Sequence, residues 1–279
     1  MPARRPRISQ QQTEQRVLAA AVDQVNAAGL TVSLDHLSFE AVISGADVSR
    51  TAAYRRWPSK DLFLNDLVRE LAMAATPRAV VENASWALIA DLVLVEPERL
   101  SEPGRRWALG VELMRQAADA DFAVMHSSAE WRTYLALNAT FLSITDPELR
   151  AEVQSALAEA QQRFVEGIAA GWQLLAGLLG FRLCAGVTSF DTLAAMISAS
   201  VRGLVIMALA DPAFATDRLE ADPFGAGKAP WSLAALGCAS IAATFLEPDP
   251  DVRWDEARVA ALRRAMTSGS LAGAGLMGS

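Results

Sequence analysis

The sequence has few of the residues and motifs that carry redox, metal or covalent chemistry. Its 279 residues include only two cysteines, Cys184 and Cys238, which are too few for a disulfide framework. His126 has no cluster of Cys, Asp or Glu at metal-ligand spacing around it, and His36 is expected in an extended connection without a special role. The nucleotide-binding glycine motifs and the G-x-S-x-G turn of serine hydrolases do not occur. We therefore do not expect an enzyme, and we expect neither a metal nor a cofactor.

Signals for secretion and for a membrane span are lacking as well. The basic start of the chain, Arg4 to Arg7, is followed by Ser9 and three glutamines instead of an apolar segment. The longest apolar stretch, 193–210, carries Arg202 near its middle, and a central arginine costs about 2.5–3.5 kcal/mol on membrane insertion. A buried helix explains this stretch better. The chain is 52% hydrophobic and 20% charged, which excludes intrinsic disorder, and we expect a cytoplasmic protein without membrane contact.

The charge is distributed unevenly along the chain. The whole chain has a net charge of −7, but residues 1–60 hold eight basic and five acidic side chains, a net +3. Residues 1–12 and 48–60 contain no acidic residue at all. A segment that approaches phosphates excludes carboxylates, so these two segments indicate a nucleic-acid contact. A solvated face with chance charge spacing is the alternative.

Apolar periodicity predicts helices throughout and no strand. Four helices are expected in the N-terminal part, of which the first covers about 13–28 and the second and third are short. Proline and glycine positions then separate longer helices, expected at 79–95, 103–119, 121–143, 147–179, 189–210, 231–246 and 252–266. Residues 211–230 are rich in Pro, Gly and Asp and are expected to form a long loop. Three regions follow: a domain at 1–75 with a flexible basic arm at 1–12, a helical domain at 76–266, and a disordered tail at 267–279.

Two short helices joined by a tight turn at 45–48 form a helix-turn-helix candidate, a motif that places its second helix in the DNA major groove. Ser38 and Ser49 stand at the positions of N-caps. Ala53 and Trp57 are four residues apart and are expected to be buried together. On another face of the second helix, residues with side chains that bind bases or phosphates lie near its N-terminal end: Arg50, Thr51 and Tyr54.

This segment resembles the TetR family of bacterial transcriptional regulators. The family pattern is alanine-glycine-valine-serine, three variable residues, leucine-tyrosine, two residues, phenylalanine, one residue and serine-lysine. The chain has Ala46-Asp47-Val48-Ser49, then Ala53-Tyr54, then Trp57-Pro58-Ser59-Lys60. Asp47 replaces the turn glycine, and aspartate is one of the few residues enriched at positive φ. The connection from residue 29 to residue 38 is longer than in the family.

The resemblance implies an all-α fold, with an N-terminal three-helix DNA-binding bundle and a larger C-terminal helical domain for ligand binding and dimerisation. It places Tyr54 and Lys60 at phosphate-contacting positions, and Arg50, Thr51 and Arg55 at positions that vary with the operator. The complete predicted DNA-binding set is Ser38, Ser49, Arg50, Thr51, Ala52, Tyr54, Arg55, Arg56 and Lys60.

Aromatic and methionine residues are concentrated in region 103–143. Such residues form ligand pockets between helices, and they equally form a plain core. The resemblance implies an inducer site in this part of the chain, for a small hydrophobic effector. The predicted ligand-binding residues are Trp107, Met114, Phe122, Met125, His126, Trp131, Tyr134, Asn138 and Phe141.

The helices expected at 147–179 and 189–210 carry continuous apolar stripes and small residues that allow close helix approach. The resemblance implies that two helices from each chain form a dimer interface, whereas packing within one chain is the alternative. The predicted interface residues are Leu157, Phe164, Ile168, Trp172, Ile197, Val201 and Leu204.

Together these features predict a transcriptional repressor that binds a palindromic double-stranded DNA operator as a homodimer. A small hydrophobic ligand is expected to release it. Two alternatives stay open: an activator of the same fold, and a helical small-molecule-binding protein that does not bind DNA.

Overall fold

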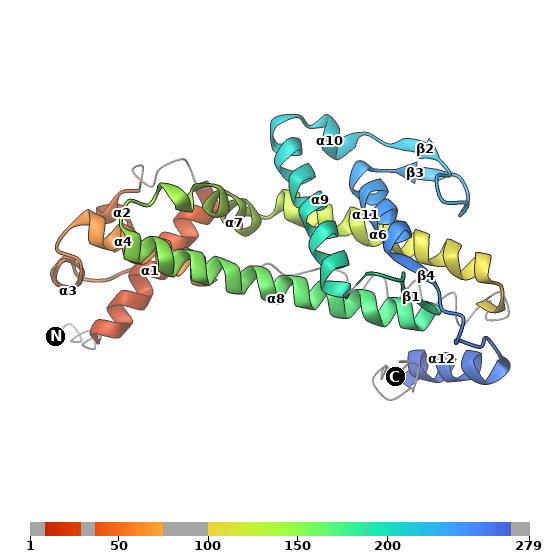
Figure 1. Ribbon diagram of the computed structural model, residues 1–279. Helices are drawn as coiled ribbons and strands as arrows, with labels where there is room; N and C mark the ends of the chain where they lie inside the picture. Colours follow the sequence, from red (N-terminus) through yellow and green to blue (C-terminus); the bar gives the residue numbers. More distant parts are fainter. Residues whose placement is uncertain (1–8, 29–36, 75–99, 188, 269–279) are drawn as a thin grey trace, which may run out of the picture. The chain divides into compact units, whose positions relative to one another are not determined.

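The computed structural model describes residues 9–28, 37–74, 100–187 and 189–268 (Figure 1). These residues are mostly helical, as predicted, and contain eleven α-helices and four strands of three residues each. Contacts divide the chain into two compact units. Unit 1 comprises the described residues of 1–77 and 128–162, and unit 2 those of 78–127 and 163–279. The long helix α8 (Pro147–Leu179) begins in unit 1 and ends in unit 2.

Unit 1 begins with four helices, each started by a residue that satisfies free backbone N–H groups. Ser9 opens α1 (Gln10–Ala28) with a reciprocal capping box, because its hydroxyl accepts from Gln12 N and the Gln12 side chain accepts from Ser9 N. Ser38 and Ser49 cap α2 and α3 as predicted, and Ser59 precedes α4. The bounds of these helices are Phe39–Gly45, Arg50–Arg56 and Lys60–Ala74.

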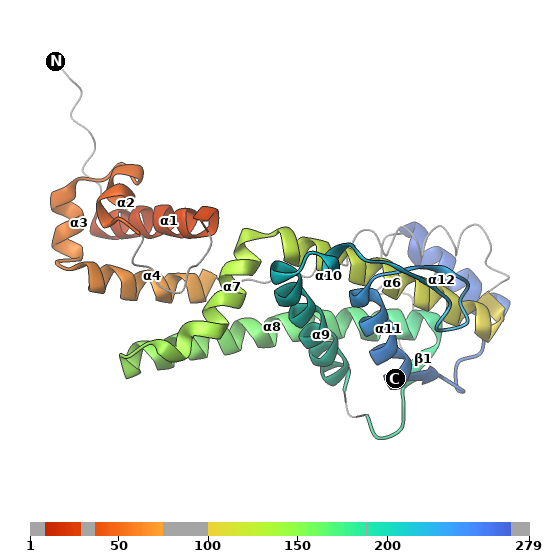
Figure 2. The same ribbon diagram turned by 90° about the horizontal axis from the view of Figure 1, so that it is seen from above.

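Three aromatic rings hold α2, α3 and α4 together. The rings of Phe39 and Phe63 are stacked with centroids 4.5 Å apart, and Trp57 contacts both rings edge-on. Trp57, Phe63 and Ala53 are fully buried, which confirms that Ala53 and Trp57 close this small core together. Figure 2 shows α3 between α2 and α4, at the end of unit 1 away from α7.

The connection between α2 and α3 is a tight turn. Asp47 has φ 52°, the only positive φ of a non-glycine residue in the described ranges. Short polar side chains tolerate this left-handed conformation because they bond to nearby backbone groups. The prediction that Asp47 supports a tight turn is confirmed.

The bounds of the two units differ from those of the predicted domains, 1–75 and 76–266. Unit 1 also contains α7 (Ala129–Thr140), the 3-10 helix η3 (Phe141–Ser143) and the first part of α8. The reason is packing, since α7 contacts both α1 and α4. Thr133 in α7 donates a hydrogen bond of 2.9 Å to Asn26 in α1, and Arg69 in α4 forms an ion pair with Glu152 in α8.

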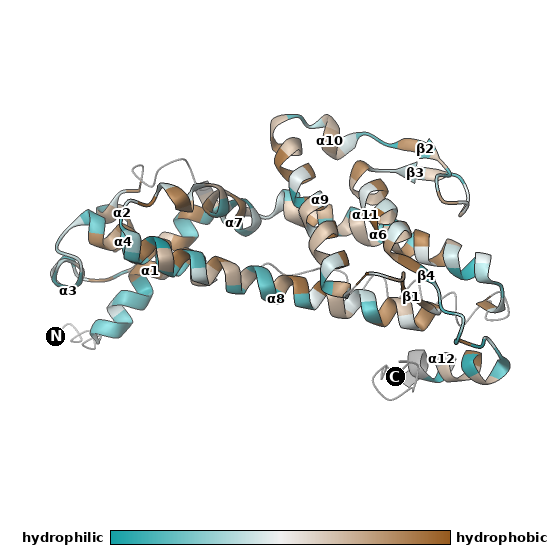
Figure 3. Ribbon diagram, in the orientation of Figure 1, coloured by the Kyte–Doolittle hydropathy of each residue, from teal (hydrophilic) through white to brown (hydrophobic). Residues whose placement is uncertain are grey.

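Three helices form the centre of unit 2. They are α6 (Pro103–Ser127), α9 (Phe190–Ala210) and α11 (Leu233–Phe245), and each packs against the other two. Among the described helices, α9 alone is long and apolar enough to cross a membrane, and Figure 3 shows its apolar character along most of its length. Seven of its residues are buried against the rest of the unit. A core helix has the same length and composition, but only 39% of the apolar window of α9 is buried, so the expectation of a buried helix is met on one face alone.

The prediction of no strands was wrong, because region 181–248 contains two small antiparallel ladders. In one, β1 (Phe181–Leu183) pairs with β4 (Leu246–Pro248). In the other, β2 (Leu219–Ala221) pairs with β3 (Ala229–Trp231), and all but Trp231 lie inside the expected loop 211–230. Three-residue strands are too short to produce a readable alternation of polar and apolar residues.

Several predicted helix boundaries also shift. The helices expected at 103–119 and 121–143 are instead α6 and α7, because Ser128 caps α7 through a hydrogen bond from Trp131 N and no breaker interrupts α6 at residue 120. Residues 10–12 of the predicted arm belong to α1, and the rest of that arm up to residue 8 lies outside the described residues. The helix expected at 79–95, the long connection 29–36 and the tail beyond Ser268 lie outside them too. The remaining helices are α10 (Ala213–Thr216) and α12 (Glu256–Ser268).

Two guanidinium groups cap the C-terminal end of α8. Arg106 donates to the carbonyl of Leu179 at 3.1 Å, and Arg258 donates to that of Gly177 at 2.7 Å. Both guanidinium groups lie over the Trp254 ring, at 4.4 Å and 5.0 Å from its centroid. Burial lowers the pKa of each arginine. Cations at this end of a helix satisfy carbonyls that have no partner within the helix.

Gly180, the residue after α8, tests this packing. It has φ +69°, and a Cβ there would lie 2.7 Å from Trp254 Nε1. Gly186 has φ +93° with nothing within 4 Å of an added Cβ, so Gly186→Ala isolates the backbone cost of about 1–2 kcal/mol. We expect Gly180→Ala to reduce the free energy of unfolding by a further 1–3 kcal/mol or so, measured by urea denaturation. Equal losses in the two variants would contradict the close packing of Trp254.

Candidate functional site

The exposed face of α3 contains several of the predicted DNA-binding residues. Arg50, Thr51 and Arg55 are exposed there, and Lys60 is exposed at the first position of α4. The Arg50 side chain is 74% exposed. Arginine, lysine and threonine supply hydrogen-bond donors suited to phosphate oxygens and base edges. These four side chains are therefore held at one end of unit 1 by a short capped helix and the start of the next.

The predicted set also contains residues that serve the structure of this end. Ser38 and Ser49 accept hydrogen bonds of 3.2 Å from Ala41 N and Ala52 N, so each hydroxyl oxygen fixes the start of a helix. Ala52 is half-buried. A serine that accepts from a backbone N–H still has its own hydroxyl proton to donate.

Sequence reasoning missed the acidic residue at this face, Glu40. It lies in the first turn of α2, and its Oε1 accepts a hydrogen bond of 2.6 Å from the Tyr54 hydroxyl. Its Oε2 lies 2.6 Å from Nη2 of Arg50. The hydrogen bond to Glu40 raises the pKa of Tyr54. Segment 48–60 has no acid in sequence, yet the fold places a carboxylate between two of its side chains.

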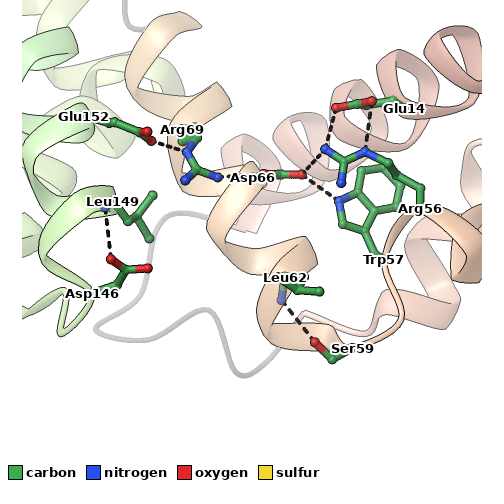
Figure 4. Close-up of polar contacts among 10 residues, drawn as sticks. All are labelled: Glu14, Arg56, Trp57, Ser59, Leu62, Asp66, Arg69, Asp146, Leu149 and Glu152. Carbon is green, nitrogen blue, oxygen red and sulfur yellow. Dashed lines mark hydrogen bonds and ion pairs between the residues drawn. The ribbon is translucent and has the colours of Figure 1, made fainter.

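Arg56 is turned toward the other helices of the bundle instead of the exposed face (Figure 4). Its Nε and Nη2 donate to the two carboxylate oxygens of Glu14 in α1, at 3.0 Å and 2.9 Å. Nη2 also donates to Asp66 Oδ2 at 2.6 Å. The contact with Glu14 raises the pKa of Arg56. A guanidinium engaged by two carboxylates holds α1, α3 and α4 together, so we leave Arg56 out of the proposed contact surface.

Asp66 joins this cluster to the rest of unit 1. Its Oδ2 also accepts from the indole Nε1 of the buried Trp57 at 2.9 Å, and its Oδ1 accepts from Arg69 Nη1 at 2.8 Å. Arg69 in turn pairs with Glu152 in α8, which raises the pKa of Arg69. Figure 4 shows the continuous series of contacts from Glu14 to Glu152. The helix that carries the exposed basic residues is thus fixed at its C-terminal end by charge-assisted hydrogen bonds.

The predicted ligand-binding residues do not come together in one unit. Those of α6 belong to unit 2, where the Trp107 indole donates to the carbonyl of Phe224 and the Phe122 ring stacks on His126. Those of α7 and η3 belong to unit 1, where the Trp131 and Tyr134 rings meet edge-on. Most are buried among other helices, in contrast to the exposed Asn138. Met114 and Met125 are core residues of unit 2.

The predicted dimer residues are mostly covered within the chain itself. Leu157, Phe164, Ile197 and Val201 are buried, and Ile168, Trp172 and Leu204 are half-buried. The exposed apolar face of α9 is formed instead by Met196, Ala199, Gly203, Ile206 and Met207. Both faces of α9 are apolar, so periodicity in the sequence does not separate the face that is buried within the chain from the exposed one.

The described residues contain no group of three or more His, Cys, Asp or Glu side chains placed to hold a metal ion. Burial raises the pKa of Cys238 to about 12, so its thiol is protonated at neutral pH. Comparison of the chain with known protein families, with curated proteins and with solved structures found no significant match. The exposed face of α3 is therefore the feature of this chain on which a function is best argued.

Asp66→Asn tests the cluster beneath that face. An amide keeps the size of the side chain but removes the charge that two arginines share, and one NH₂ group would face cationic donors. We expect the free energy of unfolding to fall by about 1–3 kcal/mol in urea denaturation. Asp61→Asn, at an exposed acid in the same helix, is the matched control and should change it by less than about 0.5 kcal/mol. Equal effects of the two substitutions would contradict the role of Asp66.

Proposed function

We propose that this protein is a transcriptional regulator that binds double-stranded DNA through α3 and acts as a repressor. The proposal combines the resemblance of segment 46–60 to the TetR family with the local structure of that segment. The observation that carries it is the pair of short helices α2 and α3, joined by a turn in which Asp47 has a positive φ. Two helices joined in this way are the arrangement that inserts its second helix into a major groove.

The side chains on α3 support this use of the helix. Arg50 and Thr51 occupy its first turn, which is the end that approaches base edges in such motifs. Arginine binds O6 and N7 of guanine with two hydrogen bonds. Arg55 and Lys60 carry further positive charge at the same end of unit 1, where phosphates would be contacted. The acidic remainder of the chain, with 17 basic and 27 acidic residues from 61 to 279, disfavours binding by the whole surface.

We further propose that the DNA-binding form is a homodimer. A single seven-residue helix reads few bases, whereas two copies related by a two-fold axis read a palindrome. The exposed apolar stripe of α9, from Met196 to Met207, supports a contact between chains on this helix. Gly203 lies within that stripe and has no other atom within 4 Å of an added Cβ, so a second helix could approach closely there. We therefore propose the exposed face of α9 as the dimer interface. The interface residues predicted from the sequence are mostly buried within the chain and are left out of it.

Release by a small hydrophobic effector completes the proposal and is supported by the family resemblance. An effector acts by favouring a spacing of the two α3 helices that does not match the operator. The half-buried Trp107 on α6 is the predicted ligand residue from which a search for the effector site in unit 2 should begin.

Selection of bound sequences from a random double-stranded DNA pool, at about 0.15 M salt, tests the proposal directly. Enrichment of one palindrome would support a dimeric regulator. Recovery of only salt-labile, unenriched DNA would overturn specific binding, because contacts to phosphate alone carry no sequence information.

Arg50→Ala identifies the base-reading residue. If Arg50 contacts a base, the variant should lose about 1–3 kcal/mol of operator binding and less on random DNA, measured by fluorescence anisotropy. The control is Arg105→Ala, an exposed arginine of unit 2, which should leave both affinities unchanged. Equal losses on operator and random DNA would instead make Arg50 a phosphate contact.

Ile206→Glu tests the dimer face. The Ile206 side chain is 54% exposed, so a charge there is tolerated by a single chain but would be buried in the proposed interface. We expect the dimer dissociation constant to rise at least about 100-fold, measured by sedimentation. Leu142→Glu, at the exposed Leu142 of η3, is the matched control and should leave the dimer intact. A wild-type protein that sediments at 29.8 kDa would contradict the dimer itself.

A further inference from the structure

Glu40 occupies a specific place between two side chains of α3. Arg50 and Tyr54 are four residues apart and therefore project from neighbouring turns on the same side of the helix. The Glu40 carboxylate reaches both, with Oε1 on the Tyr54 hydroxyl at 2.6 Å and Oε2 at 2.6 Å from the Arg50 guanidinium. The Phe39 ring lies edge-on to the Tyr54 ring at 5.4 Å and so helps to hold the tyrosine beside Glu40.

The two contacts differ in kind. The Tyr54 hydroxyl donates a short hydrogen bond to Oε1. The Oε2 atom is buried and forms an ion pair with Arg50, but it accepts no hydrogen bond of good geometry. The Arg50 side chain is 74% exposed, so water and ions reach it freely. An ion pair whose guanidinium is exposed to this degree and that lacks a directed hydrogen bond is weak, and the guanidinium exchanges readily to another anion.

A carboxylate and a phosphate diester are similar hydrogen-bond acceptors, because each presents anionic oxygens to a guanidinium and a hydroxyl. The donors that Glu40 engages are those that a DNA backbone would engage. We infer that Glu40 is an internal substitute for a DNA phosphate, which covers Arg50 and Tyr54 until a duplex displaces it. This inference rests on the proposed DNA-binding function and adds a specificity-determining residue to it.

The consequence is discrimination between operator and random DNA. On random DNA, a backbone phosphate must displace the carboxylate, and the duplex also meets the negative charge of Glu40. On an operator, Arg50 leaves Glu40 for a guanine edge, and the two hydrogen bonds gained there offset the lost ion pair. Glu40 thus lowers the affinity for the operator and for random DNA, and it lowers the affinity for random DNA by the larger factor. An acidic residue that lowers general affinity while sparing the correct target is a known route to specificity.

The experiment compares full-length wild type with Glu40→Gln on a random 30-base-pair duplex and on the selected operator, at several salt concentrations. We expect Glu40→Gln to bind random DNA about two- to fivefold more tightly, which is the effect of removing one exposed ion pair. The slope of log K against log salt should stay nearly the same, because the same phosphate is contacted in both complexes once the carboxylate is displaced. The gain on the operator should be smaller, so that the ratio of the two affinities falls.

Two controls separate this effect from a general change of charge. Asp61→Asn removes one exposed carboxylate next to Lys60 without touching Arg50 or Tyr54, and its gain on random DNA should be smaller. In a chain that already carries Arg50→Gln and Tyr54→Phe, adding Glu40→Gln should give no gain beyond that of Asp61→Asn. Equal gains from Glu40→Gln and Asp61→Asn, or a gain that persists in the doubly substituted chain, would overturn the inference.

A measurement without DNA checks the contact itself. The chain has only two tyrosines, so ring-carbon NMR of labelled Tyr54, assigned with Tyr54→Phe, follows its titration. Glu40→Gln should lower the pKa of Tyr54 toward its ordinary value, and an unchanged titration would overturn the inference. If neither wild type nor Glu40→Gln binds any duplex, the proposed function fails and this inference fails with it. Equal gains in random-DNA affinity from Glu40→Gln and Asp61→Asn, by contrast, overturn this inference and leave the proposed function standing.

Discussion

The N-terminal part of this protein depends on the carboxylate of Asp66. It receives the Arg56 guanidinium, the Trp57 indole and the Arg69 guanidinium at distances from 2.6 Å to 2.9 Å. These partners come from the C-terminal end of α3 and from α4 itself, and Arg56 adds α1 through Glu14. A partly buried carboxylate of this kind is stable only while all its partners are in place, because each charge would otherwise be desolvated without compensation. The orientation of α3 follows from this cluster and from the aromatic core beside it.

The two ends of α3 therefore serve different purposes. The C-terminal end is fixed by Asp66 and by the fully buried Trp57. The N-terminal end is capped by Ser49 and carries exposed side chains, of which Arg50 and Tyr54 contact Glu40. A helix held firmly at one end and exposed at the other is suited to presenting side chains to a large ligand with little rearrangement. This contrast is the physical basis on which we propose DNA binding.

Much of the local structure could be predicted from the sequence, because it is determined by neighbouring residues. Ser38 and Ser49 cap their helices, and Asp47 adopts a positive φ, since each effect involves atoms within a few residues. The predicted helix 147–179 coincides with α8 because a continuous apolar stripe ends at Gly180, which adopts the left-handed conformation common after helices. The three-residue strands could not be predicted in this way, since they are too short to show an alternation of polar and apolar residues and they form by pairing with another segment.

The sequence by itself determined the helices, their caps, the tight turn and the basic character of α3. Only the tertiary structure decided which charges meet. It brings Glu40 to Arg50 and Tyr54, and it turns Arg56 toward Glu14, although segment 48–60 contains no acid. It also decided which apolar face of α9 is buried and which is exposed. The physical reason is range: capping and helix propensity act within a turn or two of the chain, whereas ion pairs and burial depend on residues that only folding brings together.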